Sequence, residues 1–162
     1  MSANVTSVRL AILNAMQQTF TDVQENKPPA DPYGVTFSTV ALGPLAPFDQ
    51  KKRYSLGLAM GPEKETFQFP FIMCFMTVNL ELRITVNKGD NPPGQMIEEL
   101  ITVVKRVVGD NRQWGGLAID SKIVGTEVDL ETYWDRSALA VVKCEVQYRY
   151  SSNDPRSQNS DA

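Results

Sequence analysis

The stretch that decides the fold reads Ala138-Leu139-Ala140-Val141-Val142-Lys143-Cys144-Glu145-Val146-Gln147-Tyr148-Arg149-Tyr150. From Val142 onward, apolar or amphipathic residues occupy every second position, with charged or amide residues between them. This period of two is typical of a strand that buries one face and exposes the other. A single domain of residues 1–150 is expected to end here. Residues 151–162 are polar, so we expect a disordered tail.

A second run with the same period, residues 78–86, is the cleanest alternation in the chain. Two half-buried strands favour an antiparallel sheet with one wet face, since a sheet covered on both faces reads as continuous apolar runs. If the two strands are neighbours, cross-strand ion pairs are expected on the wet face. The candidates are Glu81 and Arg83 with Lys143, Glu145 and Arg149.

Upstream of these runs the sequence predicts a β-hairpin. Residues 53–60 and 65–75 read as its two strands, because Gly61-Pro62-Glu63-Lys64 between them has the composition of a turn. Shorter strands are expected at residues 35–42 and 122–130. Prolines mark residues 25–34 and 43–49 as loops.

Two helices complete the set of elements. Apolar residues at helical spacing predict a helix over residues 4–20, capped by Ser2 or Asn4. A second helix is expected to begin at Asn91-Pro92 and to end before Gly109. The order of elements predicts an α+β fold: a largely antiparallel β-sheet with two helices packed on one face and a projecting β-hairpin arm.

Composition limits the functional classes. The 162 residues are 42% hydrophobic and 22% charged, with a net charge of −3. A chain with this balance lacks the basic excess needed for tight binding to phosphates. Because no run approaches about 18 apolar residues and the N-terminus has no secretory signal pattern, we expect an intracellular protein without a membrane partner.

Histidine is absent, which excludes Ser-His-Asp and Cys-His nucleophiles and histidine-ligated zinc. The two cysteines, Cys74 and Cys144, are expected to be buried, and a disulfide between adjacent strands stays open. An acidic stretch reads as a solvated face because it lacks the spacing of a calcium loop. Its members are Asp120, Glu127, Asp129, Glu131 and Asp135. We therefore expect no catalytic residue, metal or cofactor.

Aromatic residues exceed what one small sheet face needs, and the sequence leaves two explanations open. They either fill the core or face a neighbouring subunit, because interfaces favour Phe, Tyr and Trp. The set comprises Phe67, Phe69, Phe71, Phe75, Trp114, Tyr133 and Trp134.

The end of the chain, residues 141–150 followed by Asn153-Asp154-Pro155, resembles the final strand of tail terminator and tail completion proteins of tailed bacteriophages. The order of elements is similar over most of residues 1–156. The resemblance implies a structural virion protein, assembled in the host cytoplasm. Its homo-hexameric ring would cap the tail tube, stop its polymerisation and join it to the neck or head-completion protein. DNA would pass through the lumen without specific binding.

For the contacts of such a ring we single out two regions, onto which no family motif maps. Phe67, Phe69 and Phe71 are expected to contact a neighbouring subunit or the tube. The loop from Trp114 to Leu117 is expected to form part of the opposite face of the subunit. Another head-tail joining or sheath-terminator protein remains an alternative. A different class, a small-ligand binding domain or an enzyme that relies on carboxylates with Lys or Tyr, also remains.

Overall fold

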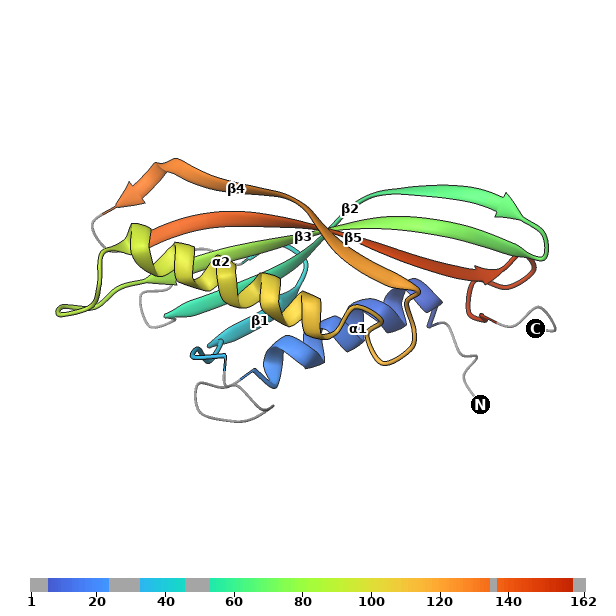
Figure 1. The fold of residues 1–162 in the computed structure, drawn as a ribbon, viewed down its shortest axis with the longest axis horizontal. Helices are drawn as coiled ribbons and strands as arrows, with labels where there is room; N and C mark the ends of the chain where they lie inside the picture. The colour runs from blue at the N-terminus through green and yellow to red at the C-terminus, as the bar shows by residue number, and fades with distance from the viewer. Residues whose placement is uncertain (1–5, 24–32, 46–52, 135–136, 159–162) are drawn as a thin grey trace.

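The computed structural model describes residues 6–23, 33–45, 53–134 and 137–158, with the side chains of residues 130–134 left aside. The elements are α1 (Val8–Thr21), β1 (Thr39–Leu42), β2 (Tyr54–Gln68), β3 (Phe71–Thr85), α2 (Pro93–Asp110), β4 (Asp120–Trp134) and β5 (Ser137–Ser151). They form one five-stranded sheet with both helices on the same side of it (Figure 1). The predicted α+β fold class is confirmed.

The strand order in the sheet is β1-β2-β3-β5-β4. Only β1 and β2 are parallel, and every other neighbouring pair is antiparallel. The two alternating runs of the sequence lie side by side, since β3 pairs with β5 along their whole length, from Phe71 opposite Ser151 to Thr85 opposite Ser137. The sheet is therefore built on these two central strands.

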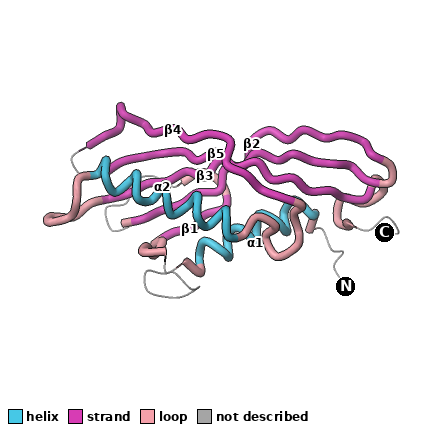
Figure 2. Tube along the Cα trace, viewed as in Figure 1, coloured by secondary structure: helices cyan, strands magenta, loops and turns pink. Residues whose placement is uncertain are grey.

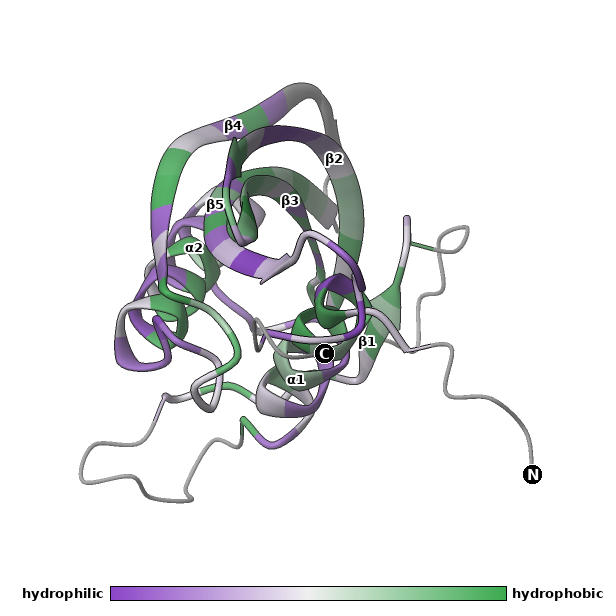
Figure 3. Ribbon diagram, turned by 90° about the vertical axis from the view of Figure 1, so that its right-hand side faces the viewer, coloured by the Kyte–Doolittle hydropathy of each residue, from purple (hydrophilic) through white to green (hydrophobic). Residues whose placement is uncertain are grey.

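The sheet curves over the two helices when it is viewed along its long axis (Figure 3). We call the side that carries the helices the helix face and the other side the outer face. On the helix face, the inward residues of β3 and β5 are buried, as the period of two predicts. They are Cys74, Met76, Val78, Leu80, Leu82, Ile84, Ala138, Ala140, Val142, Cys144, Val146 and Tyr148.

Both helices bury an apolar stripe against this face. In α2 the buried residues recur at helical spacing: Met96, Ile97, Leu100, Ile101, Val104, Val107 and Val108. In α1 the corresponding residues are Val8, Ile12, Leu13, Met16 and Phe20. The core thus lies between one sheet face and two helices, as expected.

The helix ends differ from the predictions. The N-cap of α1 is Ser7, whose Oγ accepts a hydrogen bond of 3.0 Å from the Leu10 N–H, so Ser2 or Asn4 as cap is wrong. The side chain of Asn91 does not cap α2, which begins at Pro93. This helix also continues through Gly109 to Asp110, because the amide of Asn111 binds the carbonyl of Val107 at its end.

The predicted hairpin exists, but its turn lies elsewhere. β2 continues through Gly61 to Gln68, and the turn is Phe69-Pro70. Between Met60 and Glu63 the register shifts, which places Gly61 and Pro62 in a bulge. Proline lacks an N–H and is tolerated at bulges, so turn-forming residues here interrupt the ladder without ending the strand. The three strands predicted at residues 53–60, 65–75 and 78–86 are therefore only two in the structure, β2 and β3, of 15 residues each.

The ion pairs of the outer face also differ from the prediction. Lys143 binds Glu127 at 3.0 Å and Glu145 lies 3.6 Å from Lys122, so these two charged residues of β5 pair with β4. The register explains this, because Glu81 lies opposite Val141 and not opposite a basic residue.

Residues 151–158, expected as part of a disordered tail, make hydrogen bonds with the rest of the chain. The Ser152 N–H donates to the Pro70 carbonyl at 2.9 Å, and the Pro155 carbonyl accepts from the Val8 N–H at 2.9 Å. Gln158 donates its amide to the carbonyl of Leu117. The segment after β5 thus connects the hairpin turn, the start of α1 and the loop before β4. Residues 159–162 lie outside the described residues.

Candidate interaction site

Around the hairpin turn, β2, β3 and the adjoining end of β5 extend beyond the helices as a ribbon (Figure 2). We call this part the arm. It consists of Gly61–Met76, which contains the hairpin turn, together with the adjoining end of β5, Val146–Ser151. Because β3 pairs on both sides here, the arm is a ladder of three strands and stiffer than a free hairpin.

Two phenyl groups at the end of the arm point into solvent. Phe69 is 80% exposed and Phe67 is 63% exposed, and their ring centroids lie 6.3 Å apart. Exposed aromatic pairs on a rigid element are typical anchors of protein interfaces. The sequence-based expectation that these residues are available for contact agrees with their exposure.

Phe71 has a different environment from the other two. It is half-buried on the outer face, and the Arg149 guanidinium lies 4.1 Å from its ring centroid. This cation–π contact covers the ring and links β3 to β5 near the tip of the arm. Phe71 therefore contributes to the stiffness of the arm more than to its exposed surface.

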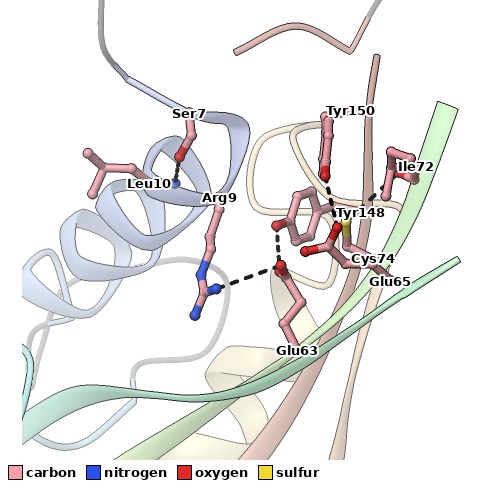
Figure 4. Close-up of polar contacts among 9 residues, drawn as sticks. All are labelled: Ser7, Arg9, Leu10, Glu63, Glu65, Ile72, Cys74, Tyr148 and Tyr150. Carbon is pink, nitrogen blue, oxygen red and sulfur yellow. Dashed lines mark hydrogen bonds and ion pairs between the residues drawn. The ribbon is translucent and has the colours of Figure 1, made fainter. Parts of the chain in front are cut away.

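A cluster of polar side chains on the helix face joins the arm to α1 (Figure 4). The Tyr148 hydroxyl donates to Glu63 at 2.5 Å, and the Tyr150 hydroxyl donates to Glu65 at 2.9 Å. On the other side Arg9 of α1 lies 3.7 Å from the Glu63 carboxylate. Glu63 is therefore held between a phenol and a guanidinium that belong to different elements.

The environment of this cluster raises the pKa values of three of its side chains. Desolvation raises the pKa of Glu63, the neighbouring Glu65 raises it further, and the Tyr148 hydroxyl and Arg9 oppose the rise. Burial and the Glu63 carboxylate raise the pKa of Tyr148 well above its usual range. Burial and the bond to Glu65 raise the pKa of Tyr150 to about 12. Both tyrosines therefore act as neutral hydrogen-bond donors at physiological pH.

The cysteines are free and buried, and no disulfide joins them. Cys74 lies opposite Tyr148 and Cys144 lies opposite Val78, so the two thiols are displaced along the ladder. Burial raises the pKa of Cys74 to about 11 and that of Cys144 to about 12. Thiols of this kind are unreactive small hydrophobes.

The second predicted contact region, Trp114 to Leu117, is not a surface of this kind. Trp114 is 2% exposed, its indole Nε1–H donates to the Ser121 hydroxyl at 2.8 Å, and its ring lies 6.1 Å from that of Phe20. Leu117 is half-buried and packs against the core. Trp114 anchors the loop to α1. Because its side chain is buried, it does not form the contact surface that the sequence predicted.

An open cavity of about 480 Å³ lies on the outer face, which sequence reasoning missed. Its floor includes Leu139 and Val141, and its walls carry Glu81, Arg83, Glu127 and Asp129. One wall is Leu45, whose N–H donates to Glu81 at 3.1 Å as the chain crosses back over β2. This crossing depends on Gly57, where a Cβ would lie 2.8 Å from the Gly43 carbonyl oxygen.

The acidic stretch is dispersed over the β4 side of the sheet. Asp120 accepts two hydrogen bonds of 2.8 Å from Arg112, and Glu127 binds Lys143. The side chains of Glu131 and Asp135 lie outside the described residues. Within the described ranges, no three acidic or sulfur side chains gather as a metal site would require, and no helix has the length and apolar character of a membrane span.

The chain was compared with known proteins. No family model matches it, and no curated protein matches it. Functional inference therefore rests on the arm, the cavity and the edges of the sheet.

Proposed function

We propose that this protein is a tail terminator of a tailed bacteriophage. In this proposal its copies form a hexameric ring on the last disc of the tail tube, stop its polymerisation and offer a docking face to the neck or head-completion protein. The observation that carries the proposal is the stiff arm that ends in exposed Phe67 and Phe69. The resemblance of the terminal strand and the order of elements add to it.

A ring of this kind requires a head-to-tail contact between two different patches of each copy. When the rotation between copies closes, such a contact leaves no growing end, which is the property that stops a tube. The arm supplies one patch, since its tip reaches beyond the body that carries the helices (Figure 2). The task needs shape and apolar contact and no bond-making.

The charge of the chain fits the passage of DNA through such a ring. With a net charge of −3 per copy, the ring repels the phosphate backbone weakly and does not bind it. Basic residues grafted onto the lumen should then slow ejection of the genome, and unchanged ejection would refute this part of the proposal.

The proposal is tested by mixing the purified protein with tail tubes and imaging the tube ends by electron microscopy. Wild-type protein should form rings that cap the ends. A Phe67→Ser, Phe69→Ser double variant should stay folded but leave the ends uncapped. The matched control is Leu10→Ser, which removes an exposed apolar residue of α1 outside the arm and should still cap. A wild-type chain that stays monomeric and ignores the tubes contradicts the proposal.

Two other functions are kept as alternatives. Another head-tail joining or sheath-terminator protein would use the same arm on a different ring. A ligand-binding domain or carboxylate-based enzyme is favoured by the outer-face cavity, whose walls carry Glu81, Glu127 and Asp129 around an apolar floor. Size in solution separates the classes, because a monomer that binds a small molecule in the cavity supports the second and a ring supports the first.

A further inference from the structure

Both edges of the sheet contain a regular stretch without a strand partner among the described residues. β1 covers β2 only from Ser55 to Leu58, so the outer side of β2 is open along the arm. Beyond the bulge, its register is continuous over Glu63–Gln68, which we call the β2 edge. At the opposite side of the sheet β4 is regular over Gly125–Asp129, which we call the β4 edge. The two open segments have similar length.

Exposed apolar side chains gather at these edges. Phe67, 63% exposed, lies in the β2 edge, and Met60, 56% exposed, lies just before it. Val124, 50% exposed, directly precedes the β4 edge at its bulge. Open edges with apolar residues are templates for pairing with another chain, and monomeric proteins protect them. Here the bulges lie outside the two regular stretches and leave them open to pairing.

The strand directions at the two edges suit a head-to-tail contact. β2, β3, β5 and β4 follow one another in antiparallel pairs, so β2 and β4 run in opposite directions. A rotation about an axis along the strands preserves the direction of each strand and the face turned to the axis. A copy related by such a rotation therefore presents its β4 antiparallel to β2 of its neighbour, as the ladder requires.

Charge on the outer face is complementary between the edges. Lys64 is the one basic residue of the β2 edge, and it lies on the outer face because it pairs with Phe75. The β4 edge carries Glu127 and Asp129 on the same face. An antiparallel alignment of the two stretches brings Lys64 close to these carboxylates and Phe67 close to Val124.

We propose that the β4 edge of one copy adds as an antiparallel strand to the β2 edge of the next copy. The sheets of successive copies then form one continuous ladder around the assembly. This inference rests on the ring of the proposed function and names its contact. The ring could also form through other contacts, so a ring without this strand pairing is a distinct outcome.

The test uses cysteines introduced on the outer face at two positions of the full chain, Thr66→Cys in the β2 edge, opposite Met73, and Gly125→Cys in the β4 edge, opposite Lys143. The natural Cys74 and Cys144 are fully buried and stay unmodified in the folded protein. A short bis-maleimide is added, and covalent species are separated on a denaturing gel beside native mass spectrometry. The control combines Thr66→Cys with Lys105→Cys on the exposed side of α2.

The double variant should give a covalent series up to the full ring, while each single variant and the control give none. Rings without crosslinks overturn the inference and leave the ring of the proposed function in place. Crosslinking of Thr66→Cys alone also overturns it, because that result means β2 pairs with β2. A chain that stays monomeric overturns both.

A second measurement does not depend on cysteines. Lys64→Glu and Glu127→Lys should each weaken association several-fold, and the double exchange should restore it. Since Glu127 also binds Lys143 within its own copy, only the rescue by the double exchange is specific for the contact between copies. Absence of rescue overturns the inference.

Discussion

The Tyr148 hydroxyl on β5 reaches across β3 to a carboxylate oxygen of Glu63 on β2, at 2.5 Å. Glu63 in turn lies 3.7 Å from Arg9 of α1. Three elements far apart in the sequence thus meet at one carboxylate at the base of the arm. This relationship fixes how the arm is held against the body of the protein.

Tyr148→Phe should destabilise the fold. Tyr148 is 2% exposed, and removal of its hydroxyl leaves the partly desolvated Glu63 carboxylate without one of its hydrogen-bond donors. Hydrogen bonds to charged groups contribute about 1.5–3 kcal/mol, so we expect a decrease of that size in the free energy of unfolding. The measurement is urea unfolding followed by circular dichroism.

Tyr150→Phe is the matched control for that variant. Its hydroxyl makes the same type of bond, to Glu65 at 2.9 Å, but in a more exposed position. The expected loss is smaller, about 0.5–1 kcal/mol, since water replaces the lost donor. Equal losses for the two variants would contradict the special role of the Tyr148–Glu63 bond.

The raised pKa of Glu63 predicts a pH dependence of stability. A carboxyl whose native pKa lies above its unfolded value, about 4.3, binds its proton more tightly in the native state. Its contribution to stability is therefore fully present below the unfolded pKa and is lost as pH rises through the native pKa. Glu63→Gln removes this titration and keeps an oxygen that accepts from Tyr148.

Unfolding free energies of wild type and Glu63→Gln should be measured from about pH 4 to pH 7. We expect the wild type to lose stability relative to the variant as pH rises across this range. Glu98→Gln, an exposed carboxyl of α2 away from this cluster, serves as the control. A constant difference between wild type and Glu63→Gln would mean that the Tyr148 and Arg9 contacts fully compensate the burial of the charge.

The sequence predicted the fold class because the period of two in β3 and β5 reports burial directly. It misplaced the hairpin turn because composition alone does not separate a turn from a bulge: Gly61-Pro62 suits both, and pairing with β3 and β5 decides. The cap of α1 was missed for a related reason, since Val5 extends the helical pattern beyond Ser7 and a pattern does not reveal which hydroxyl binds the first N–H.

The site was only partly accessible to sequence reasoning. The sequence suggested Phe67 and Phe69 as contacts because aromatic residues exceed what one sheet face needs, and it did not reveal that they lie at or beside the true turn. The burial of Trp114 depends on Phe20, which is distant in the sequence, and on Ser121, which carries no signal of its own. The Arg9–Glu63–Tyr148 cluster joins three elements and has no local pattern. The positive φ of Trp114, 47°, likewise reflects tertiary packing that overrides backbone preference.

Gly57→Ala should destabilise the crossing of the chain over β2. The new Cβ would lie 2.8 Å from the Gly43 carbonyl oxygen and 3.0 Å from the Leu45 N, both backbone atoms that cannot turn aside. Overpacking of this kind costs about 1–3 kcal/mol, to be measured by urea unfolding. The control is Gly125→Ala on β4, where the nearest atom is a flexible Lys143 carbon at 3.7 Å, and an equal loss there would contradict the prediction.

Trp114→Ala should act through the fold and not through assembly. Removal of a buried aromatic side chain costs about 3–5 kcal/mol, so the free energy of unfolding should fall by that amount. Trp114→Phe keeps most of the ring packing against Phe20 and loses the bond to Ser121, for which we expect about 0.5–1.5 kcal/mol. If the Trp114→Ala variant keeps its stability and loses only association, Trp114 is an interface residue and this prediction is wrong.

Phe67→Ser with Phe69→Ser should give the opposite result. Both rings are mostly in solvent, so their removal should change the free energy of unfolding by no more than about 0.5 kcal/mol. Association should nevertheless be lost, because aromatic anchors dominate the energy of an interface. Urea unfolding and native mass spectrometry on the same sample separate the two effects. If the double variant loses stability in proportion to its loss of association, the rings support the arm itself and the aromatic tip is not a contact surface.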